Sequence, residues 1–166
     1  MVRAVVLSLV ALLWLLAPAG ALAEPAGPAG SVLWAAPLPE TTVTRLFDQL
    51  PNRYTAGHRG FDLEAAPDTP VLAAGNGIVA FAGMVAGRPV VSVEHAGGLR
   101  TTYEPVVASV AAGQVVARGS PIGLLSAGHA GCPVEACLHW GLRRGEVYLD
   151  PLSLLRPPRV RLLPWD

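Results

Sequence analysis

The side chains in this sequence that can do chemistry are four histidines, two cysteines and a small set of carboxylates. His58 and Asp62 lie four residues apart, and His139 follows much later in the chain. Imidazole nitrogens and carboxylate oxygens are common zinc ligands, and three protein ligands leave the fourth position of a tetrahedral ion open for water. His58, Asp62 and His139 are therefore candidate ligands of a hydrolytic Zn2+ site.

The spacing alone leaves a second interpretation open. On a straight strand, His58 and Asp62 would share a face but stand about 13 Å apart at ~3.3 Å per residue. A shared metal needs each ligand atom within about 2.2 Å of the ion, so the backbone must bend, which Gly57 and Gly60 permit. The alternative is a surface ion pair between His58 and Asp62, with His139 hydrogen-bonded in the core.

Short apolar runs between glycines and prolines predict the strands that must position these residues. The runs are rich in β-branched residues and bounded by turn formers, and they cover 71–74, 77–82, 89–94, 99–103, 106–110, 115–117, 122–125 and 138–142. Long helical periodicity is absent after the first 23 residues, although Thr42–Leu50 is a candidate short helix or turn. The sequence predicts a mostly β fold, a small antiparallel sandwich or partly open barrel.

The first 23 residues have the composition of a secretory signal peptide. Arg3 precedes an apolar run over residues 4–17, and residues 21–23 supply the small residues of a cleavage site near Ala23. An uncleaved anchor is the alternative, since the run approaches the ~20 residues of a bilayer span. Pro18 and Gly20 break the run, which favours cleavage. After it we expect a Gly/Pro-rich linker (24–41), a β domain (42–156) and a C-terminal tail (157–166).

The two cysteines also have two interpretations. In an exported protein, Cys132 and Cys137 most simply form a disulfide that closes a short loop. Alternation along a strand places Cys137 on the face of His139, so the alternative is a fourth zinc ligand that would make the site structural.

The charged residues exclude two function classes. All 12 basic residues are arginine, they balance 12 acidic residues, and no basic stripe occurs. A phosphate-backbone binder needs such a stripe, so we expect no nucleic-acid partner. Without lysine, the chain cannot carry a lysine-linked biotin or lipoyl group.

The longer motifs resemble the lysostaphin/LytM-type zinc metallopeptidases, which cut peptidoglycan cross-bridges. The matching segments, in order, are His58-x-x-x-Asp62, 65–79, 93–103, 113–123, Leu138-His139-Trp140-Gly141-Leu142 and Leu149-Asp150-Pro151, over about Thr55 to Leu155. The resemblance implies a small antiparallel β structure of the duplicated hybrid motif type. It also implies that His58, Asp62 and His139 bind the Zn2+ whose water attacks a peptide carbonyl.

The sequence departs from the family pattern at two positions. The family carries a Tyr-x-His after the central strand and a histidine two positions before the last ligand, both associated with proton transfer. Pro105 and Cys137 stand there in this chain. General acid–base help is typically worth ~10²–10⁴ in rate. Losing both histidines without a replacement would therefore cripple the enzyme.

Other side chains are candidates for the missing roles. His129, in a glycine-rich loop that leads towards His139, is our first candidate proton carrier, and Tyr103 is expected to line the site. Glu104 is expected to point to the opposite face, and His95 to serve as a surface or supporting group. Arg143 or Arg144 is a candidate for binding substrate carboxylates.

The resemblance therefore implies a secreted, cell-wall-associated zinc metalloendopeptidase that hydrolyses peptide bonds of peptidoglycan. We expect it to be a monomer, outside the membrane once mature. The alternative, favoured by the loss of both histidines, is a catalytically impaired family member that binds peptidoglycan or regulates another wall hydrolase.

Overall fold

The structure of the protein is a computed structural model that describes residues 33–40, 42–49, 51–52 and 54–156. The expected signal peptide, the expected tail and the first part of the expected linker lie outside these residues. Within the described ranges, no helix has the length and apolar character needed to cross a membrane.

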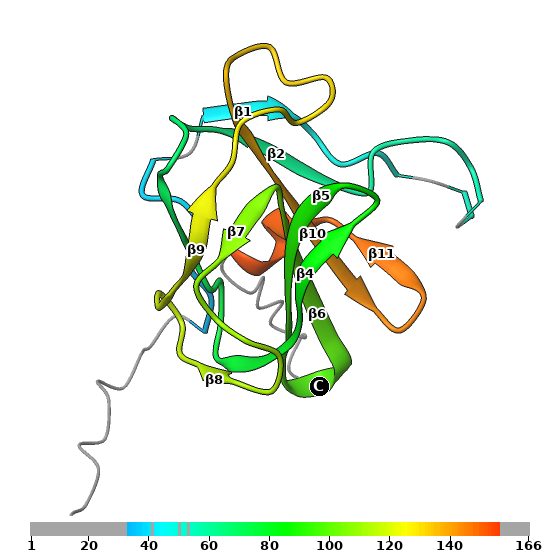
Figure 1. Ribbon diagram of the computed structural model, residues 1–166. Coiled ribbons are helices and arrows are strands. Elements are labelled where there is room, and N and C mark those ends of the chain that lie inside the picture. The colour runs from blue at the N-terminus through cyan, green and yellow to red at the C-terminus, as the bar shows by residue number, and fades with distance from the viewer. Residues whose placement is uncertain (1–32, 41, 50, 53, 157–166) are drawn as a thin grey trace, which may run out of the picture. The chain divides into compact units, whose positions relative to one another are not determined.

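Antiparallel strands are the main secondary structure of the described chain (Figure 1). In chain order they are β1 (Thr42–Arg45), β2 (Gly60–Glu64), β3 (Pro70–Leu72), β4 (Gly77–Val85), β5 (Arg88–Glu94), β6 (Leu99–Glu104), β7 (Val106–Ala108), β8 (Val115–Val116), β9 (Pro121–Leu125), β10 (Cys137–Arg144) and β11 (Val147–Leu149). Two short 3-10 helices, η1 (Ala96–Gly98) and η2 (Pro151–Leu154), accompany them. The strands that the apolar runs predicted are all found, with ends shifted by a few residues.

The strands form two sheets. The larger has the order β1-β2-β10-β6-β5-β4-β8, with β11 added beside β10, and the smaller has the order β3-β9-β7. Both sheets are antiparallel. In the larger sheet β1 and β8 are the two edge strands and are not paired with each other, so this sheet does not close into a barrel. The prediction of a mostly β, antiparallel, open fold is confirmed.

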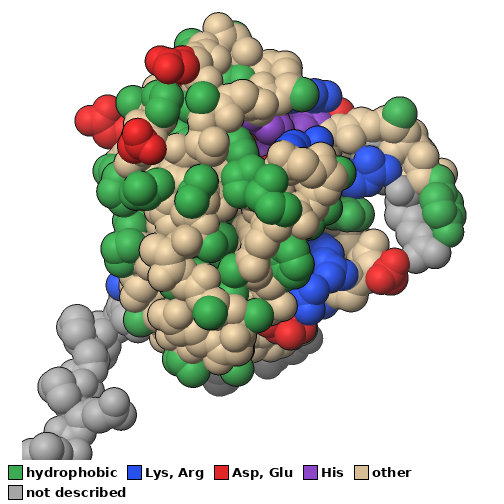
Figure 2. All heavy atoms as spheres, viewed as in Figure 1, with side chains coloured by type: hydrophobic (Ala, Val, Ile, Leu, Met, Phe, Trp, Pro, Cys, Tyr) green, Lys and Arg blue, Asp and Glu red, His purple; other side chains and the backbone are tan. Residues whose placement is uncertain are grey.

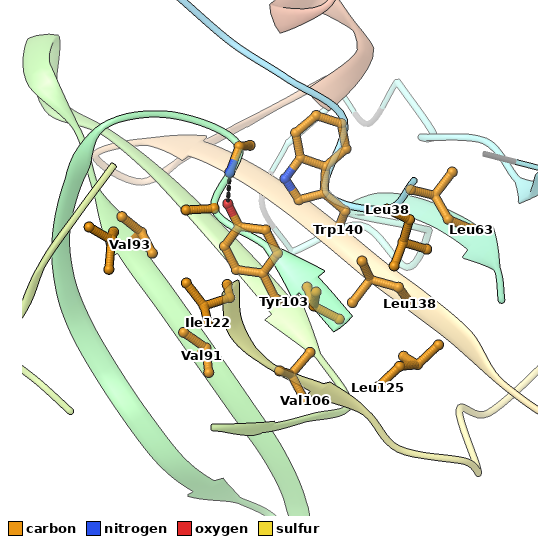
Figure 3. Packing of buried hydrophobic residues seen from close by; sticks show 14 of the residues in the cluster. Leu38, Leu63, Val91, Val93, Tyr103, Val106, Ile122, Leu125, Leu138 and Trp140 are labelled. Atoms are coloured by element: carbon orange, nitrogen blue, oxygen red, sulfur yellow. Dashed lines mark hydrogen bonds between the residues drawn. The ribbon is translucent and has the colours of Figure 1, made fainter. Parts of the chain in front are cut away.

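The hydrophobic core lies between the two sheets (Figure 3). Tyr103 on β6 and Trp140 on β10 face each other in register and are fully buried. Ile122 and Leu125 on β9 pack into the same cluster from the smaller sheet. Because side chains alternate along a strand, His139 lies on the face of β10 opposite Trp140. The core therefore anchors one face of β10 and leaves the other for the candidate site.

Two segments differ from the sequence-based expectation. Thr42–Arg45 was expected to be a helix or turn, and it is the edge strand β1 paired with β2; its alternating Thr and Val residues suit a strand. Inside the range expected to be a linker, Leu38 is buried in the core, and the Ala35 N–H donates to the Ala74 carbonyl at 2.8 Å. The packed unit thus includes residues before β1.

Candidate metal centre

The β2–β10 pairing brings the three predicted ligands together. Asp62 on β2 lies directly opposite His139 on β10, and residues opposite each other in a sheet share a face. His58 precedes β2, where the chain bends as the four-residue spacing required. The potential ligand atoms of the three residues all lie within 4.8 Å of one another.

The three ligand atoms form a compact triangle. His58 Nε2 and His139 Nδ1 lie 2.9 and 2.8 Å from the same Asp62 oxygen, Oδ1, and the two nitrogens are 3.0 Å apart. Ligands of a tetrahedral zinc ion, with bonds of about 2.0–2.2 Å, are separated by roughly 3.3 Å. A small outward movement of each side chain would therefore accommodate the ion.

The hydrogen bonds of His58 also fit a bound cation. The His58 Nδ1–H donates to the Leu46 carbonyl at 2.7 Å, so in a neutral ring Nε2 carries a lone pair. Nε2 lies 2.9 Å from the Asp62 carboxylate oxygen, so either a proton or a metal ion must lie between these two atoms, and Zn2+ can take the place of the proton. A carbonyl that accepts from the outer nitrogen is also the usual support of a zinc-bound histidine. The residues present fit Zn2+.

Asp62 is poised to stay ionised. Burial alone would raise its pKa. Hydrogen bonds from His129 and His139, together with the charges of His58 and His139, outweigh burial and hold the pKa of Asp62 well below its usual range. Asp62 is therefore a carboxylate at neutral pH, as a metal ligand must be.

Gly60 is a positional requirement that the sequence did not reveal. A Cβ atom there would overlap the ring of His139, which reaches across the β2 backbone. From the sequence alone, Gly60 is explained only by the bend after His58. Only glycine lets the imidazole come this close, and the signal for it is visible only once β2 and β10 are paired.

The loop before β10 places His129 beside the triangle. Its Nε2 lies 3.3 Å from Asp62 Oδ2, the oxygen that His58 and His139 do not contact. Its ring stacks on that of His139, with centroids 5.6 Å apart and planes at 25°. Its Nδ1 is buried without a hydrogen-bond partner among the described residues. The cluster thus holds a third imidazole in addition to the two candidate ligands.

The same loop carries the cysteines. The Sγ atoms of Cys132 and Cys137 lie 2.02 Å apart, the separation of a disulfide bond. The Cys132 N–H donates to the His129 carbonyl at 3.2 Å. With its sulfur bonded to Cys132, Cys137 supplies no thiolate ligand, so the alternative of a fourth cysteine ligand does not hold in this structure.

Two residues lie elsewhere than expected. Tyr103 does not line the site: it is buried in the core on the opposite face, its hydroxyl accepts from the Ala74 N–H at 2.9 Å, and burial raises its pKa to about 12 (Figure 3). Glu104, expected on the opposite face, lies in register with His139 and shares its face. Its carboxylate is bound by Arg88 Nε at 2.6 Å.

His95 lies away from the cluster. It is buried, its Nδ1 is 2.8 Å from the Asn76 carbonyl, and its Nε2 is 2.7 Å from the Thr101 hydroxyl. These contacts link β5 to β6 and to the turn before β4, so His95 supports the fold.

Comparison with known proteins gives a family match and several relatives. Residues 56–151 match Peptidase family M23. An uncharacterised protein of Mycobacterium tuberculosis is 52% identical over 130 residues, which cover 76% of this chain and 52% of that protein. The chain thus spans about half the length of the curated relatives it matches.

Solved structures share the fold. SpoIIQ, in complex with SpoIIIAH, has a TM-score of 0.62 and 26% identity, over 72% of this chain and 98% of the other. A zinc-containing peptidase from Vibrio cholerae has a TM-score of 0.58 and 24% identity, over 74% and 39%. The antimicrobial peptidase lysostaphin from Staphylococcus simulans has a TM-score of 0.60 and 21% identity, over 74% and 54%.

Proposed function

Because the chain belongs to peptidase family M23, we propose that it is a zinc metalloendopeptidase that hydrolyses peptide bonds of cell-wall peptidoglycan. The observation that carries the proposal is the triangle of His58 Nε2, Asp62 Oδ1 and His139 Nδ1, with edges of 2.8–3.0 Å. A site built only for structure would be closed by a fourth protein ligand. Here Cys137, the residue best placed to close it, is bonded to Cys132.

Access to substrate supports a catalytic use of the site. Asp62 and His58 are buried, whereas one fifth of the His139 side chain is exposed. Figure 2 shows histidine side chains reaching the surface in a recess, with arginine side chains beside them. When bound, Zn2+ would polarise the scissile carbonyl and lower the pKa of the attacking water.

We assign proton transfer to His129. Its Nε2 lies next to the carboxylate of Asp62, and its ring is stacked on that of His139, a candidate ligand. A histidine held there can take a proton from water and give it to the leaving amine, the work of the residues that Pro105 and Cys137 replace. Glu104 shares this face, but its ion pair with Arg88 makes it the weaker candidate.

The proposal includes a place of action. We propose that residues 1–23 direct export, that the mature protein acts as a monomer at the cell wall, and that the Cys132–Cys137 disulfide forms in that oxidising compartment. Export would put the site in reach of peptidoglycan.

A second function is supported by the replaced histidines. A family member with weak proton transfer can retain the fold to bind peptidoglycan or a protein partner, and SpoIIQ is related in fold and is found in complex with SpoIIIAH. We favour the enzyme over the binding function because the chain has all three candidate ligands and a further histidine, His129, beside them.

The test is incubation of the protein with purified peptidoglycan, with and without a chelator, and mass spectrometry of the released peptides. We expect cleavage that the chelator abolishes and added Zn2+ restores, and none from His139→Ala. One equivalent of bound zinc without cleavage would instead favour the binding function.

A further inference from the structure

The face of the larger sheet that carries the metal ligands continues into a pocket of about 490 Å³. The pocket is lined by Tyr54, Arg59, Arg143, Glu146 and Tyr148. Resting on the proposed function, we propose that this pocket binds a carboxylate of the peptide substrate.

Strand register connects the pocket to the metal centre. On β10, His139, Gly141 and Arg143 follow at two-residue intervals and so share a face. Asp62 pairs with His139, Gly60 with Gly141, and Tyr148 of β11 with Arg143. Along this face, the ligand pair is therefore followed by a pair of glycines and then by a cation beside an aromatic ring.

The imidazole of His139 covers the glycine pair, because a Cβ atom at Gly60 would overlap that ring and one at Gly141 would lie 3.9 Å from its Nε2. The two glycines therefore let the His139 side chain reach from its own strand position toward Arg143. Four residues of strand separate His139 from Arg143, which corresponds to about 13 Å. A substrate carboxylate three or four residues from the cleaved bond, or on a long side chain nearer to it, would reach the pocket.

The two arginines are held in place by the protein. Arg59 Nη2 donates to the Thr55 carbonyl at 2.7 Å, and its guanidinium carbon lies 5.5 Å from the centre of the Tyr148 ring. Arg143 Nη1 donates to the Gly145 carbonyl at 2.7 Å. A guanidinium has five N–H donors, so Arg143 has donors beyond this one to offer a ligand.

The charge of the pocket selects an anion. Among the described residues that line the pocket, two guanidinium groups stand against the one carboxylate of Glu146, which gives this lining a net positive charge. Planar guanidinium groups bind carboxylates through two parallel hydrogen bonds, and charged hydrogen bonds are the stronger kind. Stem peptides of peptidoglycan offer carboxylates in free or amidated form, so the pocket would distinguish the two.

The test measures binding to chelator-treated protein, so it needs no hydrolysis. The probes are fluorescein-labelled Ala-D-Glu-Ala-D-Ala and the same peptide with both carboxyl groups converted to amides, followed by fluorescence anisotropy. We expect the acid to bind about tenfold more tightly than the amide, the equivalent of about 1.4 kcal/mol. Arg143→Met should remove that preference.

Arg144, the other arginine that the sequence suggested for binding carboxylates, is not among the described lining residues of the pocket. Arg144→Met is therefore the matched control, because Arg144 is the next residue on β10, is exposed and points to the other face. It should leave both affinities unchanged. Glu146→Gln should tighten binding of the acid. Equal affinities for acid and amide, or equal effects of the two arginine variants, would overturn the inference.

The inference and the proposed function can fail separately. Selective binding of the acid without any cleavage would leave the subsite standing and reject the enzyme. Cleavage by Arg143→Met with an unchanged KM for the acidic substrate would reject the subsite and leave the proposed enzyme standing.

Discussion

His129 Nε2 lies 3.3 Å from Asp62 Oδ2, while Oδ1 of the same carboxylate contacts both His58 and His139. One aspartate thus joins the candidate ligands to the candidate proton carrier. The two carboxylate oxygens of Asp62 have different contacts: Oδ1 belongs to the ligand triangle, and Oδ2 orients the imidazole of His129.

These separate contacts predict that His129→Ala lowers the rate of hydrolysis but leaves metal binding unchanged. The triangle does not include His129, so we expect one equivalent of bound Zn2+, as in the unmodified protein. Hydrolysis should fall by ~10²–10⁴, the usual contribution of a proton carrier. Zinc content by mass spectrometry and the rate of peptide release measure the two quantities.

Glu135→Ala in the same loop is the control, because Glu135 is exposed and is not a member of the ligand triangle. It should keep both metal and activity. An unchanged rate in His129→Ala would show that His129 is not the proton carrier and would leave Glu104 as the candidate.

Asp62→Asn is predicted to remove the metal. The amide has no charge to balance Zn2+, and only its oxygen can face the two imidazoles. Outer-shell substitutions already cost 10–100-fold in metal affinity, so loss of a ligand should cost roughly 100-fold or more. Competition with a chromophoric chelator measures the affinity.

Asp68→Asn is the matched substitution. Asp68 is exposed and has a positive φ of 63°, a conformation that asparagine tolerates well. The zinc affinity of the Asp68→Asn variant should equal that of the unmodified protein. If Asp62→Asn also bound zinc normally, the proposed ligand set would be wrong.

The sequence was most informative where a residue's role depends on the chain near it. Asp62 and His139 are predicted as ligands from their residue types, the spacing of Asp62 from His58 and the family resemblance. The structure places each of them between two apolar neighbours that pack into the core. The predictions that Tyr103 lines the site and that Glu104 points away from it were wrong. Only the pairing of β6 with β10 decides which of the two shares a face with His139.

Pairing also explains the features that local patterns missed. β1 is short and exposed on its outer edge, so it carries little hydrophobic signal, and its partner β2 determines that it is a strand. Gly60 is needed for a contact with His139, which is distant in sequence. The pocket that contains Arg59 and Arg143 likewise forms from two segments far apart in sequence, the chain before β2 and the β10–β11 hairpin.

Removing the disulfide is predicted to impair catalysis more than metal binding. In a Cys132→Ser, Cys137→Ser double variant, the loop loses its covalent tie to β10, and His129 is three residues from that tie. The ligands lie outside the loop, so zinc should remain bound. Stability should fall by about 2 kcal/mol, the lower end for a disulfide because the loop is short.

Urea unfolding, zinc content and hydrolysis rate together test this expectation. Treating the unmodified protein with a reductant should reproduce the lower rate, and reoxidation should restore it. A double variant with full activity would show that the loop holds His129 without the bond.

The final prediction concerns pH and the buried His95. Burial lowers its pKa from the ordinary 6.5, and the hydrogen bond to the Asn76 carbonyl opposes this only in part. The folded protein therefore favours neutral His95. As pH falls below 6.5, His95 takes up a proton in the unfolded chain before it does in the folded one, so stability present above pH 6.5 is lost on acidification.

Urea unfolding at pH 7.5 and 5.5, with a chelator present, should show this loss in the unmodified protein. The slope from this one group is at most about 1.4 kcal/mol per pH unit. His95→Gln should be less stable at pH 7.5 but lose less on acidification. His58, His129 and His139 are present in both proteins, so their contributions to stability cancel in the comparison. Parallel losses in the two proteins would show that His95 does not make stability depend on pH.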